Sequence, residues 1–277
     1  MAINTTDGNK ATNRGITVVD TAGVALGIVN LNDGTFTLTA SGAITQTGVL
    51  TTASLTLTNT TSTTVLGQTN VITNLGTIVS TGGNFSLTNN SALQLDGAIN
   101  AGSRTFTISN GANVVTFALA DGSEDITAST FTVTANDVVN LNTIRNLGTT
   151  NVVLEPDATT DTIDLAATSG TFNLSTSDIA ELKAGTGTVT IGQTAQTGAL
   201  TLGAAVDLAG RTVTINSGRV NDASNAIVAN SLTLDLASAG ANVVKTTVTS
   251  DRKSTRPNSR HKPTSYAGFC QQKKNTA

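Results

Sequence analysis

Pairs of large apolar residues, separated by a single residue, recur along most of the chain. The residues between and around these pairs are mostly Thr, Ser or Asn. Because side chains alternate between the two faces of a β-strand, each pair lies on one face and Thr lies on the other. The pattern therefore predicts short, half-buried strands. The pairs are Phe36/Leu38, Leu55/Leu57, Phe85/Leu87, Leu93/Leu95, Phe106/Ile108, Phe117/Leu119, Phe131/Val133, Ile163/Leu165, Phe172/Leu174, Val189/Ile191, Leu200/Leu202, Val213/Ile215 and Leu232/Leu234.

Clusters of Gly, Asn, Asp and Ser separate successive pairs by about eight to twenty residues and are typical of turns. No stretch keeps a helical apolar stripe for three turns. The best helix candidate is SDIAELKAG, from Ser177 to Gly185, with Ser177 as its N-cap. We therefore expect an all-β chain in which helix is minor.

Similar segments recur along the chain, which favours a stack of repeats over a sandwich or a barrel. NVITNLG at 70–76 is similar to NTIRNLG at 142–148, and RTFTISNG at 104–111 is similar to RTVTINSG at 211–218. A further motif, Gly-x-Phe-x-Leu, begins at Gly34, Gly83 and Gly170. The separations differ, but a solenoid tolerates this because its loops project from the stack. The repeats therefore predict a parallel β-helix.

The charge of the chain divides after Ser250. Residues 1–250 contain 8 Lys and Arg against 17 Asp and Glu, a net charge of −9, whereas residues 251–277 contain 7 against 1, a net charge of +6. We expect a disordered or fraying N-terminal edge at 1–14, a β-helical repeat domain at 15–250 and a non-native, unstructured tail at 251–277. The acidic repeat domain offers no electrostatic footprint for nucleic acid or for an anionic membrane.

Composition supports strands and restricts the available chemistry. Thr accounts for about one residue in five, and Thr fits a pleated strand. The only His, Tyr and Cys of the chain are His261, Tyr266 and Cys270, all within the tail. Residues 1–250 therefore lack the usual general base, the thiol nucleophile and the usual zinc ligands. We expect no catalytic residue, no cofactor and no metal site.

Two stretches resemble the repeat region of very large bacterial adhesins of the filamentous haemagglutinin type, which are secreted by the two-partner route. They are SLTLTNTTSTTVLGQTNVITNLGTIVSTGGNFSLTNNSALQLDGAINAG (54–102) and GTVTIGQTAQTGALTLGAAVDLAGRTVTINSGRVND (187–222). The resemblance implies a right-handed parallel β-helix, exported to the surface of a Gram-negative cell as a stalk or adhesive fibre. It also implies two partners, an outer-membrane secretion pore and a glycan or protein on a host or neighbouring cell.

The start of the chain departs from that family. Its secretion domain carries Asn-Pro motifs, and this chain has no Asn-Pro dipeptide. The first fifteen residues contain no apolar run of signal-peptide length, and no segment approaches the about 20 apolar residues of a membrane span. We therefore expect an interior fragment whose signal peptide and secretion domain lie upstream.

The basic tail resembles translated sequencing-adapter DNA. Residues 251–261, DRKSTRPNSRH, match the translation of a widely used adapter, DRKSTRLNSSH, at nine of eleven positions. The two exceptions, Pro257 and Arg260, are each one base change away. An alternative is a disordered basic tail that binds nucleic acid or anionic lipid. We favour the artefact, and on that interpretation His261, Tyr266 and Cys270 carry no functional information.

Two acidic segments are the remaining candidates for chemistry. Glu155 to Asp164, EPDATTDTID, holds four carboxylates that could bind a cation or form an acid/base pair if a loop brought them together. We favour a solvated turn, because no basic partner or Gly-rich metal loop accompanies them. Asp121 to Asp125, DGSED, begins like a calcium loop but lacks Gly at position six and has Thr132 at position twelve, where Glu is needed.

Three functions are compatible with a β-helix of this composition. We favour a non-catalytic structural and adhesive segment of a secreted or surface-displayed adhesin, with weak ligand contacts on its loops. A polysaccharide-degrading enzyme would gather acidic and basic residues on one face, whereas the basic residues here are scattered. Repeated Thr-x-Thr triplets, such as Thr105/Thr107 and Thr212/Thr214, resemble ice-binding ladders, although we expect irregular coil lengths to disrupt their lattice.

Overall fold

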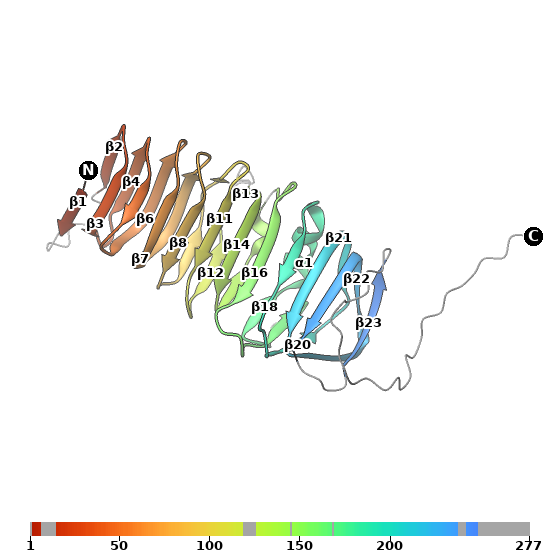
Figure 1. Ribbon diagram of the computed structural model, residues 1–277. Coiled ribbons are helices and arrows are strands. Elements are labelled where there is room, and N and C mark those ends of the chain that lie inside the picture. Colours follow the sequence, from red (N-terminus) through yellow and green to blue (C-terminus); the bar gives the residue numbers. More distant parts are fainter. Residues whose placement is uncertain are drawn as a thin grey trace, which may run out of the picture.

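The computed structural model describes residues 2–6, 15–118, 126–144, 146–167, 169–237 and 242–248 (Figure 1). Within these ranges nearly every element is a β-strand, and the strands pair in parallel with strands of neighbouring coils. The chain is therefore a parallel β-helix, as predicted. Figure 1 shows an elongated rod with β1 and β23 at opposite ends.

Short strands follow one another along the described chain and are interrupted by one 3-10 helix, η1 (Leu141–Thr143), and one α-helix, α1 (Thr176–Ala184). The strands before η1 are β1 (Ala2–Thr6), β2 (Ile16–Asp20), β3 (Val24–Asn30), β4 (Thr35–Ala40), β5 (Ile44–Gln46), β6 (Leu50–Asn59), β7 (Thr64–Val79), β8 (Phe85–Asn89), β9 (Leu93–Leu95), β10 (Ile99–Asn100), β11 (Thr105–Ser109), β12 (Val114–Phe117), β13 (Ile126–Thr127), β14 (Thr130–Ala135) and β15 (Asp137–Val139). The strands after it are β16 (Asn151–Pro156), β17 (Ile163–Leu165), β18 (Phe172–Leu174), β19 (Val189–Ile191), β20 (Ala199–Leu202), β21 (Val206–Ser217), β22 (Arg219–Leu236) and β23 (Val243–Val248).

The predicted domain boundaries fall partly on described residues. Residues 2–6 form β1, which pairs with β3, inside the segment predicted as a disordered or fraying edge. The tail at 251–277, with His261, Tyr266 and Cys270, lies outside the described residues, as does the segment from Asp121 to Asp125.

One ladder of ten parallel strands runs along the rod and sets its repeat. Eight of its nine steps advance the chain by 19 to 25 residues, and the step from Val152 to Val189 advances it by 37. Its successive in-register residues are Val24, Ile44, Thr64, Phe85, Phe106, Phe131, Val152, Val189, Val213 and Leu232. Each coil therefore stacks like side chains on like, despite unequal loops.

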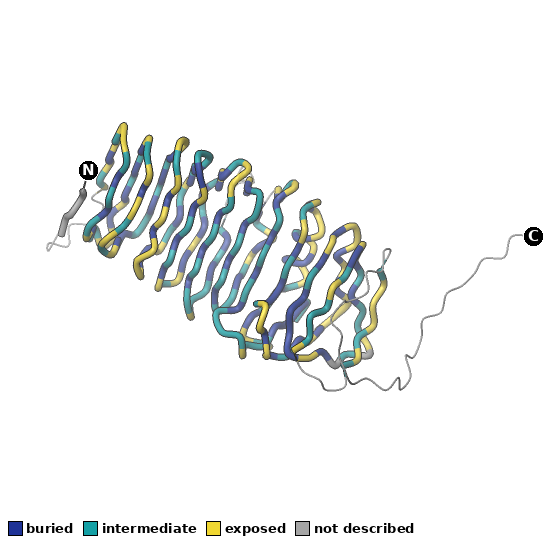
Figure 2. Tube along the Cα trace, viewed as in Figure 1, coloured by how far each residue is buried: buried dark blue, intermediate teal, exposed yellow. Residues whose placement is uncertain are grey.

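The apolar pairs predicted from the sequence form the core of the rod. All of their described members are buried except Leu232 and Leu234, which are partly buried against the core, and Leu119 lies outside the described residues. Figure 2 shows the alternation of buried and more exposed residues along the strands. Phe85 and Phe106 stack with ring centroids 4.3 Å apart, and Phe131 continues the stack at 5.8 Å from Phe106. Such pairs contribute about 0.5–1.5 kcal/mol beyond their buried area.

Buried asparagines brace neighbouring coils where strands turn. Asn59, Asn70, Asn89 and Asn110 are almost fully buried. The Asn70 Oδ1 atom accepts a hydrogen bond from the backbone N–H of Leu50, one coil away, at 2.9 Å. The Asn89 amide likewise accepts from the N–H of Ile72 and donates to the Asn110 Oδ1 atom at 2.9 Å. These amides replace the backbone pairing that the turns interrupt.

The internal repeats differ in how well they predict position within a coil. The two Arg-Thr-x-Thr-Ile segments are equivalent, because Phe106 and Val213 lie on the same ladder. The segments 70–76 and 142–148 are not equivalent in secondary structure, since the first lies in β7 and the second covers η1 and a turn. The apolar positions that the two segments share are nevertheless buried in both, namely Ile72 and Leu75 in the first and Ile144 and Leu147 in the second.

The helix α1 forms where the sequence suggests, but its N-cap is Ser175 rather than Ser177. The reason is a capping box, in which the Ser175 Oγ atom accepts from the N–H of Asp178 while the Asp178 carboxylate accepts from the N–H of Ser175. Two orphan N–H groups are thereby satisfied, which the Ser177 hydroxyl does not do.

The C-terminal half of α1 packs on β21. Lys183 forms an ion pair with Asp207 of that strand, at the surface. Arg211 lies beneath, 1% exposed, and its three guanidinium nitrogens have no hydrogen-bond partner among the described residues. Burial lowers the pKa of Arg211. Gly185 follows the helix, and a Cβ atom at this position would lie 2.6 Å from the Arg211 Nη1 atom, so that one of the two groups would have to shift.

Candidate functional site

An insertion interrupts the regular winding between β16 and β19. The extra residues of this 37-residue step contain β17, β18 and α1. The two strands lie in reverse order along the rod. β18 pairs in parallel and in register with β17, and β17 pairs on its other side with β20. The short return is tightened by Asp164, which is 2% exposed and accepts hydrogen bonds from the backbone N–H and the hydroxyl of Ser169.

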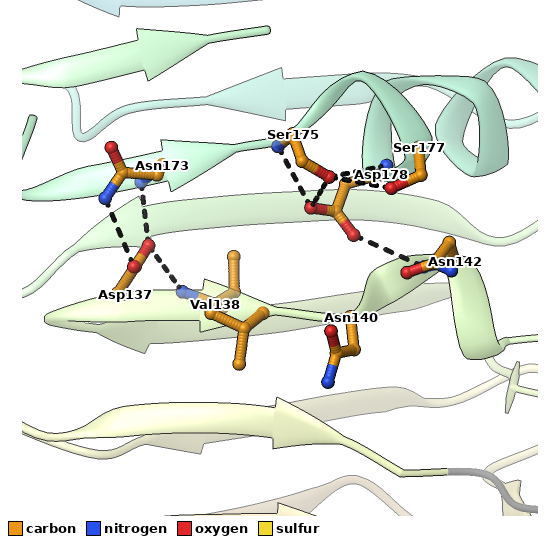
Figure 3. Close-up of a pocket in the computed structure, with 9 residues that line it drawn as sticks. Asp137, Val138, Asn140, Asn142, Asn173, Ser175, Ser177 and Asp178 are labelled. Atoms are coloured by element: carbon orange, nitrogen blue, oxygen red, sulfur yellow. Dashed lines mark hydrogen bonds between the residues drawn. The ribbon is translucent and has the colours of Figure 1, made fainter. Parts of the chain in front are cut away.

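The strands β15 and β18 meet at a discontinuity in the hydrogen-bonded wall of the rod. Among the described residues β15 has a ladder only with β12, and β18 has one only with β17. A side chain joins the two strands instead. The Asp137 Oδ1 atom accepts from the backbone N–H of Asn173 at 2.7 Å, and its Oδ2 atom accepts from the Asn173 side-chain amide at 3.2 Å (Figure 3).

Burial raises the pKa of Asp137, because the partly enclosed carboxylate loses solvation in its charged form. Hydrogen bonds from Asn173 and from the N–H of Val138 act in the opposite direction, and the nearby Asp178 carboxylate raises the pKa further. The site therefore holds two carboxylates close enough to repel each other.

Asp178 joins α1 to η1. Besides its role in the capping box, its Oδ2 atom accepts from the Ser175 hydroxyl at 2.6 Å, and its Oδ1 atom accepts from the backbone N–H of Asn142 at 3.3 Å. Asp178 is 3% exposed. Figure 3 shows the carboxylate between the first turn of the helix and the Asn142 backbone.

A cavity of about 330 Å³ opens at this junction. Seven of its lining residues are polar and two are valines; they are Asp137, Val138, Val139, Asn140, Asn142, Asn173, Ser175, Ser177 and Asp178. Within the ranges that the structure describes, no Lys or Arg lines it. The side-chain amides of Asn140 and Asn142 have no hydrogen-bond partner in the part of the chain that the structure describes, and both residues are exposed. They remain available to a ligand.

The acidic segment from Glu155 to Asp164 does not converge on this cavity. Glu155 accepts a hydrogen bond from the Thr134 hydroxyl at 2.9 Å, Asp161 accepts from the N–H of Ala158, and Asp164 closes the return described above. Across the described ranges, no group of three or more His, Cys, Asp or Glu residues is placed to hold a metal ion. The carboxylates of Glu155, Asp161 and Asp164 therefore act locally, in turns and between neighbouring coils.

The outward threonines are in closer register than the sequence suggested. Thr107 pairs with Thr132, and beyond Val153 the same line continues through Thr190, Thr214 and Thr233. Unequal coil lengths leave this register intact, because extra residues leave the stack as loops or as the insertion. The line is nevertheless interrupted at Val153.

Sequence reasoning missed the cavity residues. Asp137 and Asn173 are 36 positions apart, and no local pattern indicates that they meet. One local pattern was available, the Ser-x-x-Asp spacing of Ser175 and Asp178, which is typical of a capping box.

Comparisons with protein-family models, curated proteins and solved structures find no significant match for this chain. Among the described helices, none has the length and apolar character needed to cross a lipid bilayer.

Proposed function

We propose that this chain is a non-catalytic stalk segment of a large bacterial adhesin, secreted or displayed on the outer cell surface, with weak ligand contacts on its loops. The observation that carries the proposal is the ten-strand ladder, in which every coil is braced by the next. Ten rungs spaced by about 4.8 Å span about 43 Å from the first to the last. A repetitive rod of this kind suits a spacer that holds a binding surface away from a cell.

Adhesion by such a rod would depend on many weak contacts acting together. Linked weak sites raise the overall avidity by large factors without any new contact. In the full-length protein, export would proceed through an outer-membrane pore, and the binding partner would be a glycan or protein of a host or neighbouring cell. Neither nucleic acid nor membrane insertion has a part in this function.

The test compares one copy with many. Beads that carry many copies of the 277-residue chain are expected to attach to cultured epithelial or bacterial cells under flow, while a single soluble chain binds too weakly to remain attached. Beads coated with an unrelated protein of similar net charge serve as the control. If densely coated beads detach from every cell type as readily as the control beads, the adhesive part of the proposal is wrong.

The threonine register favours a second candidate, binding to ice. Thr107 and Thr132 lie side by side in adjacent coils, and so do Thr190 and Thr214, so that their side chains repeat at about 4.8 Å along the rod. A regular array of hydroxyl and methyl groups can hold water at fixed spacing. Thermal hysteresis or shaped ice crystals in a solution of the purified chain would support this function, and their absence would remove it.

A further inference from the structure

The cavity between β15 and α1 has the composition of a site for an uncharged, hydroxyl-rich ligand. It is about 330 Å³ in volume, at the lower end of the range of about 300–1,000 Å³ that is typical of small-molecule sites. Its walls combine amides, hydroxyls and carboxylates with two valines, of which Val138 is buried in the core and Val139 is partly exposed. A sugar ring presents the same combination, with hydroxyls at its edge and C–H groups on its faces.

The charge of the cavity selects against anions. Asp137 and Asp178 both contribute carboxylates, and among the described residues no basic side chain lines the cavity to balance them. A uronate, a sulfated glycan or a phosphate would therefore be repelled. At the N-terminus of α1, the capping box engages the N–H groups of Ser175 and Asp178, which leaves fewer N–H groups that an anion could use.

The hydrogen bonds already present favour a hydroxyl over an ammonium group. Asp137 accepts three hydrogen bonds, from Val138 and from both nitrogens of Asn173, and Asp178 likewise accepts bonds from Ser175 and Asn142. Each carboxylate keeps little remaining acceptor capacity, which suits a single O–H donor better than a full positive charge. The free amides of Asn140 and Asn142 can donate to and accept from neighbouring hydroxyls.

We propose that this cavity binds one uncharged sugar residue of a surface glycan, which rests on the adhesive function proposed above. The carboxylates accept hydrogen bonds from sugar hydroxyls, the Asn142 amide forms a hydrogen bond with an adjacent hydroxyl, and Val139 lies against the C–H face of the ring. The affinity is weak because the cavity is open and lacks an aromatic platform. Such a site gains strength only through repetition along a fibre or across many fibres.

The experiment follows backbone amide signals of the isotope-labelled full chain by NMR during titration with methyl glycosides of glucose, galactose, mannose and N-acetylglucosamine. At least one of these probes is expected to bind with a dissociation constant in the millimolar range and to shift the signals of Asp137, Asn142 and Ser177. Methyl glucuronide and methylammonium are titrated in parallel. Both are expected to bind at least tenfold more weakly than the best neutral glycoside.

Two variants separate cavity binding from surface binding. Ser177 is exposed at the rim, so Ser177→Tyr fills the cavity and is expected to weaken binding at least tenfold. Ala184, exposed two turns further along α1, lies outside the cavity, so Ala184→Tyr is expected to leave binding unchanged. Circular dichroism confirms that each variant is folded, and a second blocking variant, Asn142→Trp, replaces Ser177→Tyr if that protein does not fold.

The possible results distinguish this inference from the adhesive function. It is overturned if no neutral glycoside shifts the cavity signals, if glucuronide or methylammonium binds as well, or if the blocking variant binds normally. The adhesive function is assessed separately with coated beads of the wild type and the blocking variant. Beads that attach equally well with a blocked cavity retain adhesion and show that the cavity does not carry it, whereas wild-type beads that fail to attach refute adhesion.

Discussion

The buried Arg211 is expected to reduce the stability of the β-helix, so that Arg211→Met makes it more stable. The guanidinium is 1% exposed, and none of its nitrogens has a hydrogen-bond partner among the described residues. Burial lowers its pKa, because desolvation disfavours the charged form at this position. Arginine nevertheless remains protonated in proteins, so the charge must be buried rather than neutralised.

The magnitude follows from the cost of desolvation. Burying a charged group costs several kcal/mol, and replacing buried charges by apolar side chains of similar volume is neutral or stabilises by about 1–4 kcal/mol. Methionine keeps most of the aliphatic stem of Arg211 and its packing beneath α1. We therefore expect Arg211→Met to raise the free energy of unfolding by about 1–4 kcal/mol, or about 2–4 °C in melting temperature for each kcal/mol.

The chain provides a matched control in Arg104. It occupies the corresponding position of the other Arg-Thr-x-Thr-Ile segment, on the same ladder, but no helix covers it and it is exposed. Arg104→Met is expected to change stability by less than about 0.5 kcal/mol. Both variants are compared with the wild type by urea unfolding, followed by far-UV circular dichroism. A loss of stability of more than about 1 kcal/mol in Arg211→Met alone would refute the reasoning, because the guanidinium must then make a favourable contact.

A double-mutant cycle with Gly185 examines the same contact from the other side. In the wild type, Gly185→Ala places a Cβ atom 2.6 Å from the Arg211 Nη1 atom and is expected to destabilise the protein. In the Arg211→Met background that clash is relieved by a thinner, more flexible side chain, so the cost is expected to fall. Purely additive effects of the two substitutions would show that these residues do not meet.

Four further predictions concern the core, the asparagine braces, α1 and the tail. Phe106→Ala removes the middle ring of the aromatic stack and is expected to cost about 3–5 kcal/mol in urea unfolding, whereas Phe106→Leu is expected to cost clearly less. Asn89→Ala leaves the N–H of Ile72 unpaired in the interior and is expected to lower the free energy of unfolding by about 1–3 kcal/mol. Asn90→Ala, at an exposed neighbour, is expected to change that free energy little. Equal effects of the two substitutions would contradict the bracing role of Asn89. Burial raises the pKa of Glu181 above its usual 4.5, so its charged form lowers the stability of the protein at neutral pH, and this loss disappears as the pH falls through the raised pKa. Glu181→Gln is therefore expected to stabilise the protein at pH 7 but not below pH 4.5. A difference in stability that does not change with pH would exclude this cause. Deletion of residues 251–277 is expected to leave the melting curve by circular dichroism unchanged, and a lowered melting temperature would show that the tail contributes to the fold.

The fold could be predicted because its cause is local and repeated. Pairs such as Phe106 and Ile108 indicate which face of a strand is apolar. The similarity of RTFTISNG to RTVTINSG indicates that two distant strands occupy equivalent positions in their coils. The Gly-x-Phe-x-Leu motif was less informative. Phe85 stacks beneath Phe106 on the long ladder, whereas Phe172 pairs with Ile163 in the insertion. The motif therefore predicts a strand but not its place in a coil.

The cavity could not be predicted, because it arises from pairing that the local sequence does not encode. In the sequence, Asp137 does not differ from other carboxylates at strand ends. Only the fold places β18 beside it, where the N–H of Asn173 donates a hydrogen bond to its carboxylate. The burial of Arg211 depends in the same way on α1, since the equivalent Arg104 is exposed. The asparagine braces were overlooked for a related reason. Asparagine is typical of turns, and only the stacking of coils shows that Asn70 and Asn89 point inward.

The reversed order of β17 and β18 has a consequence for how the rod is assembled. Along the stack β18 lies next to β15 and β17 lies beyond it, although β17 is made first. A chain that emerges from its N-terminus can add most coils one after another, each on a finished template. In the insertion, β17 has no neighbouring strand to pair with on its N-terminal side until β18, which is made later, has been placed between β15 and β17. Vectorial winding is therefore expected to pause here and to resume only after a complete loop has emerged.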